Sequence, residues 1–156
     1  MSTLDASPPA PPAATRLRLD AAAVNAFLRS VFPAADQASF GDVTLLQPGR
    51  LVLSRPCGDA TLRPGGAVSG PVLMGLADHA VYAMVLAHIG IVPMAVTTSL
   101  TMHFLRPAQP GTVLAEVRLL RLGRRIATCD VLIHGGDASA PYAQATVAYA
   151  IPDGVT

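Results

Sequence analysis

The chain has 156 residues and a formal net charge of +1, with 51% hydrophobic, 13% charged and 4% aromatic residues. This length predicts one domain, and the lack of a basic run and of aromatic side chains argues against a nucleic-acid partner. With so few charges, much apolar surface must be covered by other protein, so we expect a homo-oligomer.

The two cysteines, Cys57 and Cys129, lie far apart and match neither a metal-binding nor a disulfide pattern. No group of His, Asp or Glu residues has the spacing of a zinc site. The N-terminus lacks the basic start and apolar core of a secretory signal. We therefore expect a cytoplasmic protein with reduced thiols and no metal.

The first third of the chain begins with a Pro- and Ala-rich stretch at 1–14, which is expected to be a disordered tail. The remaining residues, 15–156, are expected to form the single domain. Asp20 is placed to cap a short helix at 21–32. Alternating patterns and turn residues then predict two strands and a Gly- and Pro-rich loop, at 38–47, 50–55 and 56–68.

A long apolar helix follows, starting at Ser69-Gly70-Pro71 and ending at Gly90. It is apolar on all sides, which is typical of a buried helix, except for Asp78 in its middle. A buried carboxylate costs several kcal/mol unless it is paired, so Asp78 is a candidate for chemistry. The stretch is long enough to span a membrane, but the central Asp and the strands that follow argue against a membrane protein.

After the helix, hydrophobic residues recur at every second position, as in a β-strand. Four strands are predicted, at 96–104, about 112–121, about 125–133 and 142–151. Strands joined by short turns pair antiparallel. One long apolar helix with no second helical layer must be wrapped by a single curved sheet, which predicts an α+β fold.

Three segments in this order carry a more specific pattern. They are Ser69-Gly70-Pro71 with Leu76-Ala77-Asp78, the strand ending in Phe104-Leu105-Arg106-Pro107, and the turn Gly123-Arg124-Arg125. They resemble the "His-Gly-Gly … Leu-Ala-Asp" helix, the "Phe-Leu-Arg-Pro" strand and the Gly-Arg turn of the PaaI-type acyl-CoA thioesterases. The resemblance covers roughly residues 37–151. It implies a hotdog fold, in which an antiparallel sheet wraps a central helix and dimerises into a continuous sheet.

The resemblance also implies an activity and a role for individual residues. The activity is hydrolysis of an acyl-CoA or aryl-CoA thioester by a homodimer or homotetramer, without a metal or redox cofactor. Asp78 matches the catalytic carboxylate, as general base or nucleophile. Gly70 matches the glycine whose N–H receives the thioester oxygen, and Thr97 matches a strand hydroxyl that helps hold the water. Arg124 and Arg125 lie where positive charge could meet the CoA phosphates.

The chain departs from the family pattern at three positions. Ser69 and Pro71 replace the motif's histidine and second glycine, and Arg63 stands where a polar amide is common. We expect these three residues to contact the substrate. Tyr82 could border the acyl pocket, whose preference for an aryl or medium-chain group the sequence leaves open.

The residues alone support a site shared between chains. The N-terminus of a helix offers unpaired N–H groups, and Gly70 has no side chain to keep a carbonyl away. Asp78 is two helical turns further on, roughly 12 Å at 1.5 Å per residue. One chain's pair is too far apart to act on one carbonyl, whereas a second antiparallel chain can bring its Asp78 beside Gly70.

Other interpretations remain open at this stage. Asp78 could be a structural carboxylate, Ser69 is better explained as a helix cap than as a nucleophile, and His79 points to a different side of the helix. The alternative function is a non-catalytic acyl-CoA or acyl-ligand binding protein. A hotdog dehydratase is less favoured because Ser69 stands where it would need a histidine.

Overall fold

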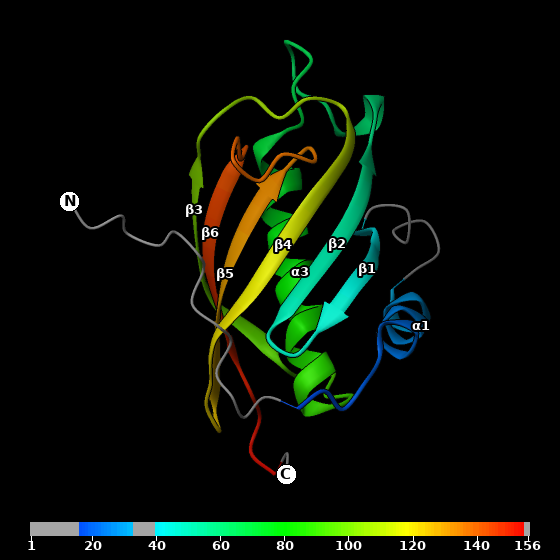
Figure 1. Cartoon of the computed structure of the whole chain (residues 1–156), viewed down its shortest axis with the longest axis vertical. Coiled ribbons are helices and arrows are strands. Elements are labelled where there is room, and N and C mark those ends of the chain that lie inside the picture. Colours follow the sequence, from blue (N-terminus) through cyan, green and yellow to red (C-terminus); the bar gives the residue numbers. More distant parts are fainter. Residues whose placement is uncertain (1–15, 33–39, 155–156) are drawn as a thin grey trace, which may run out of the picture.

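The computed structural model describes residues 16–32 and 40–154 (Figure 1). The predicted tail at 1–14 and the first two residues of the strand predicted at 38–47 lie outside the described residues, so neither prediction is tested there. The elements in chain order are α1 (Ala21–Val31), β1 (Asp42–Gln47), β2 (Arg50–Cys57), η1 (Asp59–Thr61), α3 (Gly70–Ile89), β3 (Val96–Phe104), β4 (Gly111–Leu122), β5 (Ile126–His134) and β6 (Ala143–Ala150).

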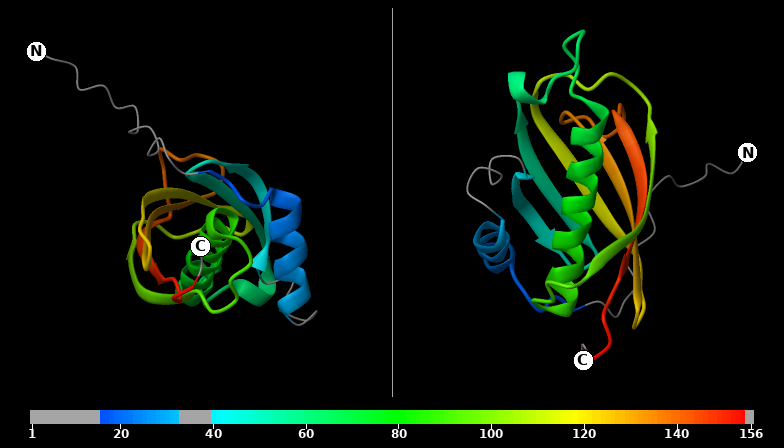
Figure 2. Two further views of the ribbon diagram at one scale, coloured as in Figure 1. Left: turned by 90° about the horizontal axis from the view of Figure 1, so that it is seen from below. Right: turned by 180° about the vertical axis from the view of Figure 1, so that it is seen from behind.

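The six strands form one antiparallel sheet in the order β1-β2-β4-β5-β6-β3. The chain crosses from β2 through α3 to the opposite edge of the sheet, so β3 is an edge strand that pairs with β6 alone. The sheet curves around α3, as Figures 1 and 2 show. This is the hotdog fold, and the predicted α+β class is confirmed.

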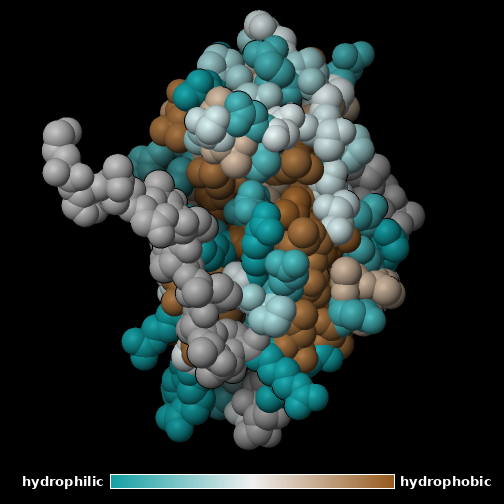
Figure 3. Space-filling view, in the orientation of Figure 1, coloured by the Kyte–Doolittle hydropathy of each residue, from teal (hydrophilic) through white to brown (hydrophobic). Residues whose placement is uncertain are grey.

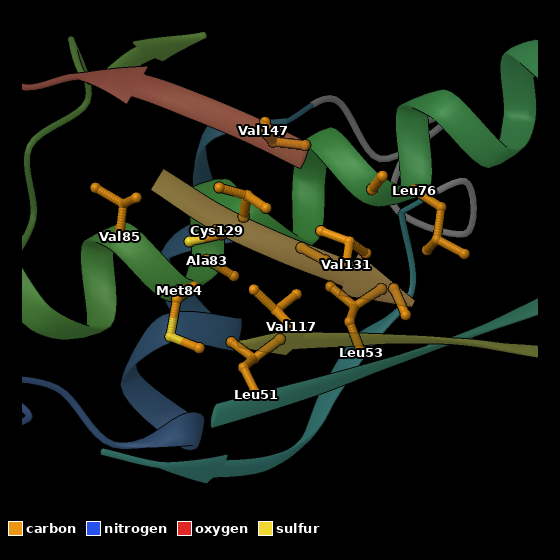
Figure 4. Close-up of a cluster of buried hydrophobic side chains, with 14 of the residues drawn as sticks. Leu51, Leu53, Leu76, Ala83, Met84, Val85, Val117, Cys129, Val131 and Val147 are labelled. Carbon is orange, nitrogen blue, oxygen red and sulfur yellow. The ribbon is translucent and has the colours of Figure 1, made fainter. Parts of the chain in front are cut away.

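The core lies between α3 and the concave face of the sheet. Alternate residues of the central strands point inward and pack on α3, among them Leu51, Leu53, Val117, Val131 and Val147 (Figure 4). Complete burial of such side chains typically contributes about 1.5–3 kcal/mol each. By length and composition α3 could cross a membrane, but 67% of its apolar window is buried inside the fold. The sheet therefore explains the hydrophobicity of the sides of α3 that it covers.

The two helix starts differ in how they are capped. Asp20 accepts a hydrogen bond from the N–H of Ala23 (2.8 Å), as the sequence predicts. Ser69 occupies the N-cap position of α3, but its side chain makes no capping hydrogen bond, so that detail of the prediction is wrong. The backbone alone forms this start, since the Ser69 carbonyl accepts from the N–H groups of Val72 and Leu73.

The outer face of the sheet faces the viewer in Figure 3 and mixes hydrophobic and hydrophilic residues. Ion pairs across it include Arg50–Glu116 at 2.9 Å and Arg118–Asp130 at 3.7 Å. On the opposite side of the molecule α3 is not covered by the sheet (Figure 2, right). That open side is where the candidate site lies.

Candidate active site

Two hydroxyl groups hold the carboxylate of Asp78. The side chain is half-buried on α3, and its Oδ1 accepts hydrogen bonds from Thr97 Oγ1 at 2.6 Å and from the Tyr149 hydroxyl at 2.8 Å. The same phenol oxygen lies 3.1 Å from the backbone carbonyl oxygen of Asp78. No hydrogen bond to Oδ2 comes from the described residues. The polar partners that a carboxylate in an apolar helix requires are thus present.

The register between β3 and β6 explains why these two hydroxyls meet. Thr97 and Tyr149 are directly paired across the strands, so their side chains lie on the same face of the sheet. A β-bulge with Thr98 as the extra residue separates Thr97 from Leu100, which pairs with Val147. Without the bulge, strict alternation would put Thr97 and Leu100 on opposite faces.

Tyr149 is a site residue that the sequence interpretation missed. It is 3% exposed, and its ring stacks on that of Tyr82 with centroids 5.9 Å apart. Burial raises the pKa of the Tyr149 phenol above its usual value, so the hydroxyl stays protonated and able to donate at neutral pH. The one signal in the sequence is its place among the inward residues of β6, where a buried phenol needs a partner.

Tyr82 is the neighbour of Asp78 one helical turn further along α3. It is half-buried, and its hydroxyl donates to the carbonyl of Pro93 at 3.2 Å. Burial raises the pKa of this phenol too. The structure thus brings Tyr82, Asp78 and Thr97, which the sequence singled out, into one cluster on the open side of α3.

A cavity of about 620 Å³ opens at the N-terminus of α3. It is lined by Arg63, Pro64, Gly65, Ala67, Val68, Gly70, Leu73, Phe104, Leu105, Arg106, Pro107 and Ala108. No acidic residue lines it, and the positive end of the α3 dipole points toward it. The site is therefore suited to an anionic or strongly polarised group attached to an apolar one.

Gly70 presents its backbone to this cavity. It is the first residue of α3, and the described residues offer no acceptor to its N–H. A Cβ at this position would lie 3.4 Å from the ring of Phe104, so the lack of a side chain keeps space open there. Arg63 lines the same cavity, and Pro71 is exposed beside it.

The structure does not bring Asp78 and Gly70 of one chain together. Asp78 does not line the cavity at Gly70, and the two residues are eight positions apart along the helix, roughly 12 Å. Within a single chain the carboxylate and the N-terminus of α3 are therefore two separate features of the surface.

Arg124 and Arg125 lie in the turn between β4 and β5, at the end of the sheet opposite to the loop around Arg63 (Figure 1). Neither lines the cavity. Arg125 forms an ion pair with Asp153 at 2.9 Å. Within one chain these arginines are thus remote from Gly70.

The histidines near the centre of α3 have structural environments. His79 is buried on the side away from Asp78, where its ring stacks on Phe40 at 4.5 Å and meets the edge of Phe32 at 5.3 Å. Burial lowers the pKa of His79 to about 4. His88 is buried and accepts from the N–H of Gly49 at 3.1 Å. Within the described ranges no group of His, Cys, Asp or Glu could hold a metal ion.

Comparison with known proteins supports the resemblance. A family model described as the thioesterase superfamily matches residues 65–140, a range that includes Gly70, Asp78 and Thr97 but not Tyr149. A curated relative from Thermoplasma acidophilum, named as a candidate esterase, is 26% identical over 96 residues, which are 62% of this chain and 72% of that protein.

Solved structures agree with the family match. A candidate thioesterase from Silicibacter sp. TM1040 is 38% identical and has a TM-score of 0.79, over 88% of this chain and 95% of that one. A single-residue mutant of the phenylacetic acid degradation protein PaaI from Thermus thermophilus is 26% identical and has a TM-score of 0.66, over 77% and 100%. The chain therefore belongs to the thioesterase superfamily of hotdog proteins, whose general activity is thioester hydrolysis.

Proposed function

We propose that the protein hydrolyses an acyl-CoA or aryl-CoA thioester to the free acid and CoA, with Asp78 as the catalytic carboxylate. The observation that carries the proposal is the environment of Asp78. Its carboxylate lies at the open side of a core helix and is fixed through one oxygen by two hydroxyls. A structural carboxylate would be expected to have both oxygens paired inside the core.

The proposed active unit is a homodimer, because Asp78 and the Gly70 N–H of one chain are too far apart to act on the same thioester. The open side of the molecule bears exposed apolar side chains, including Met74 on α3 (41% exposed) and Val96 and Phe104 on β3 (48% and 54%). Within the described residues, the outer edge of β3 beside them has no strand partner and can pair with another strand. A second copy placed antiparallel covers this surface and puts its Asp78 near the first chain's Gly70.

In this arrangement the thioester carbonyl oxygen accepts a hydrogen bond from the Gly70 N–H and faces the positive end of α3. Asp78 of the other chain takes a proton from a water, which attacks the carbonyl carbon. The tetrahedral intermediate collapses, the C–S bond breaks, and the CoA thiolate takes up the proton that Asp78 removed from the water. If Asp78 attacks as a nucleophile instead, it displaces the CoA thiolate and forms a mixed anhydride. Hydrolysis of this anhydride at the Asp78 carbonyl in a single turnover in oxygen-18 water leaves the label in Asp78, whereas the general-base route places it in the product acid.

The other candidate residues fit around this reaction. The Thr97 hydroxyl donates its proton to Asp78, and its oxygen can still accept a hydrogen bond from the water. Arg63, Ser69, Pro71 and Tyr82 are the proposed substrate contacts. In an antiparallel dimer the β4–β5 turn of one chain comes to the end where the other chain's cavity opens.

That placement gives Arg124 and Arg125 their proposed role. They would meet the CoA phosphates bound to the opposite chain, because charge-assisted contacts to phosphate favour arginine. Arg125 would have to exchange its surface partner Asp153 for phosphate, which costs little because both side chains are exposed.

The test is thiol release from a panel of acyl- and aryl-CoA thioesters by the wild type and by Asp78→Asn. The asparagine keeps the shape and can still accept hydrogen bonds from both hydroxyls, but it cannot act as a base. We expect turnover to fall roughly 10²–10⁴-fold, the usual worth of general acid–base catalysis, with folding and oligomeric state unchanged. Equal rates from both proteins would refute the role of Asp78.

One observation favours a second candidate, a non-catalytic acyl-CoA or acyl-ligand binding protein. Ser69 stands where the family motif has histidine, and its side chain makes no hydrogen bond at the helix start. This alternative predicts no thiol release by the wild type from any thioester, together with thermal stabilisation by the same compounds.

A further inference from the structure

We propose that Tyr149 is a positioning residue for Asp78: its hydroxyl fixes the carboxylate through Oδ1 and leaves Oδ2 for the reacting water. The inference rests on the proposed function of Asp78. It adds a residue that lies outside the range matched by the family model.

The contact geometry supports this role. The Tyr149 hydroxyl lies 2.8 Å from Oδ1 and 3.1 Å from the carbonyl oxygen of the same residue. The single phenol proton therefore lies between two acceptors of the same residue, and its donation to the nearer one, Oδ1, restricts rotation of the carboxylate about its side-chain bonds. Because Thr97 donates to Oδ1 as well, at 2.6 Å, both described donors use the same oxygen.

Tyr149 is itself held rigidly. Its backbone lies inside the sheet, where β6 pairs with β5 on one side and β3 on the other, and Tyr149 is opposite both Ala127 and Thr97. Its ring is buried and stacks on Tyr82. The hydroxyl thus reaches Asp78 from a fixed point, as positioning groups in active sites require.

Thr97 is a less rigid support by comparison. Its side chain is exposed in the single chain, and it stands next to a β-bulge. A bulge interrupts the ladder hydrogen bonds that hold the residues beside it. We infer that Tyr149 is the principal support and Thr97 the secondary one.

The test is Tyr149→Phe, which removes the hydroxyl and keeps the ring that packs on Tyr82. We expect kcat to fall roughly 10- to 100-fold, as for loss of a hydrogen bond to a charged group, with KM nearly unchanged. The acid limb of the pH–rate profile should move to higher pH, because a lost donor makes the ionised carboxylate less favourable. If Tyr149 had a purely structural role, the pH–rate profile would not move, and the loss would not be confined to kcat.

Tyr142→Phe is the matched control. Tyr142 precedes β6 and also carries a phenol, but its hydroxyl lies beside Gly135 and not at Asp78. We expect this variant to keep the wild-type rate and pH profile. Thr97→Val tests the ranking of the two donors and should reduce kcat less than Tyr149→Phe.

A second measurement does not depend on turnover. The carbon-13 signal of the Asp78 carboxyl group can be titrated by NMR in the wild type and in Tyr149→Phe. The titration midpoint should move to higher pH in the variant. An unchanged midpoint would overturn the inference even if the protein hydrolysed no thioester.

The two proposals fail in different ways. If Asp78→Asn is inactive while Tyr149→Phe keeps the wild-type kcat and pH profile, the positioning role is wrong and the proposed function stands. If Asp78→Asn is as active as the wild type, the proposed function is wrong, and the NMR titration alone then decides whether Tyr149 supports the carboxylate.

Discussion

Asp78 and His79 are adjacent in the sequence and lie in opposite environments on α3. Asp78 is at the open side with two hydroxyl donors, whereas His79 is buried between Phe32 and Phe40 with no hydrogen-bond partner for its Nε2 among the described residues. Burial is the main cause of the low pKa of His79, and the charge of Arg55 adds to it, while Asp78 acts in the opposite direction. His79 therefore packs as a neutral aromatic ring at neutral pH.

This environment makes stability depend on pH. The pKa of His79 is about 4 in the folded chain and about 6.5 when unfolded, so between these values the unfolded state binds more protons. The contribution is complete above pH 6.5 and is lost as the pH falls toward 4. Its full size is roughly 3–4 kcal/mol, because the two pKa values differ by about 2.5 units and each unit corresponds to about 1.4 kcal/mol.

The prediction is checked by urea unfolding of the wild type and of His79→Phe between pH 7 and pH 4.5. The phenylalanine keeps the aromatic packing and has no proton to bind, so the variant should lose less stability over this range. His88 titrates in the same direction in both proteins and cancels from the comparison, since burial also lowers its pKa. If the free energy of unfolding falls equally with pH in the two proteins, His79 is not the source of the pH dependence.

At the scale of single elements, α1 and α3 begin in physically different ways. Asp20 caps α1 with its side chain, whereas α3 starts from backbone hydrogen bonds and Pro71. Asp20→Ala should therefore lower the free energy of unfolding by about 1 kcal/mol, the usual worth of an N-cap. Ser69→Ala should change it by less than about 0.5 kcal/mol, as for a side chain without such a bond. Equal losses from the two variants would show that Ser69 caps α3 in solution.

The periodicity of each element could be predicted from the sequence, and the register between elements could not. The start and end of α3 follow from Gly70, Pro71 and Gly90, and Gly90 indeed has a positive φ of 94°. Alternation in β3 predicted the strand but suggested that Thr97 faces away from Leu100. The bulge at Thr98 reverses this, and it depends on pairing with β6, which lies far away in the sequence.

The same distinction applies to the candidate site, since some of its residues could be predicted from the sequence and one could not. Asp78 and Gly70 stood out because their residue types are unusual at those points of a helix. Tyr149 did not, because a tyrosine in a strand is ordinary and its significance comes only from the contact with Asp78, 71 residues away. A local sequence pattern identifies a residue whose type is unusual in its secondary structure element. A residue that gains its role from a contact distant in the sequence can be identified only once the fold is known.

For the molecule as a whole, the distribution of apolar surface and the division of the site point to the same second copy. The proposed interface combines the free edge of β3 with the uncovered side of α3, and both border Asp78. A monomer would leave this surface in water and would hold no complete site. Assembly and activity are thus expected to be lost together.

Mixing two inactive variants tests whether the site is shared. Asp78→Asn removes the base. Gly70→Pro removes the N–H donor at the first helical position, where proline is well tolerated and where Ser69 already has the extended backbone (φ −69°, ψ 149°) that a following proline requires. Each homodimer should be inactive, whereas a heterodimer regains one intact site from Gly70 of one chain and Asp78 of the other.

Random exchange of equal amounts makes half of the dimers heterodimers, each with one of two sites intact, so activity should recover to about a quarter of the wild-type value. Exchange is followed by native mass spectrometry with one variant isotopically labelled, so that failure to mix is seen directly. If heterodimers form and activity stays at the level of the separate variants, Gly70 and Asp78 do not act across the interface. The distance between them within one chain would then have to close by a change in α3 itself, which its packing inside the sheet opposes.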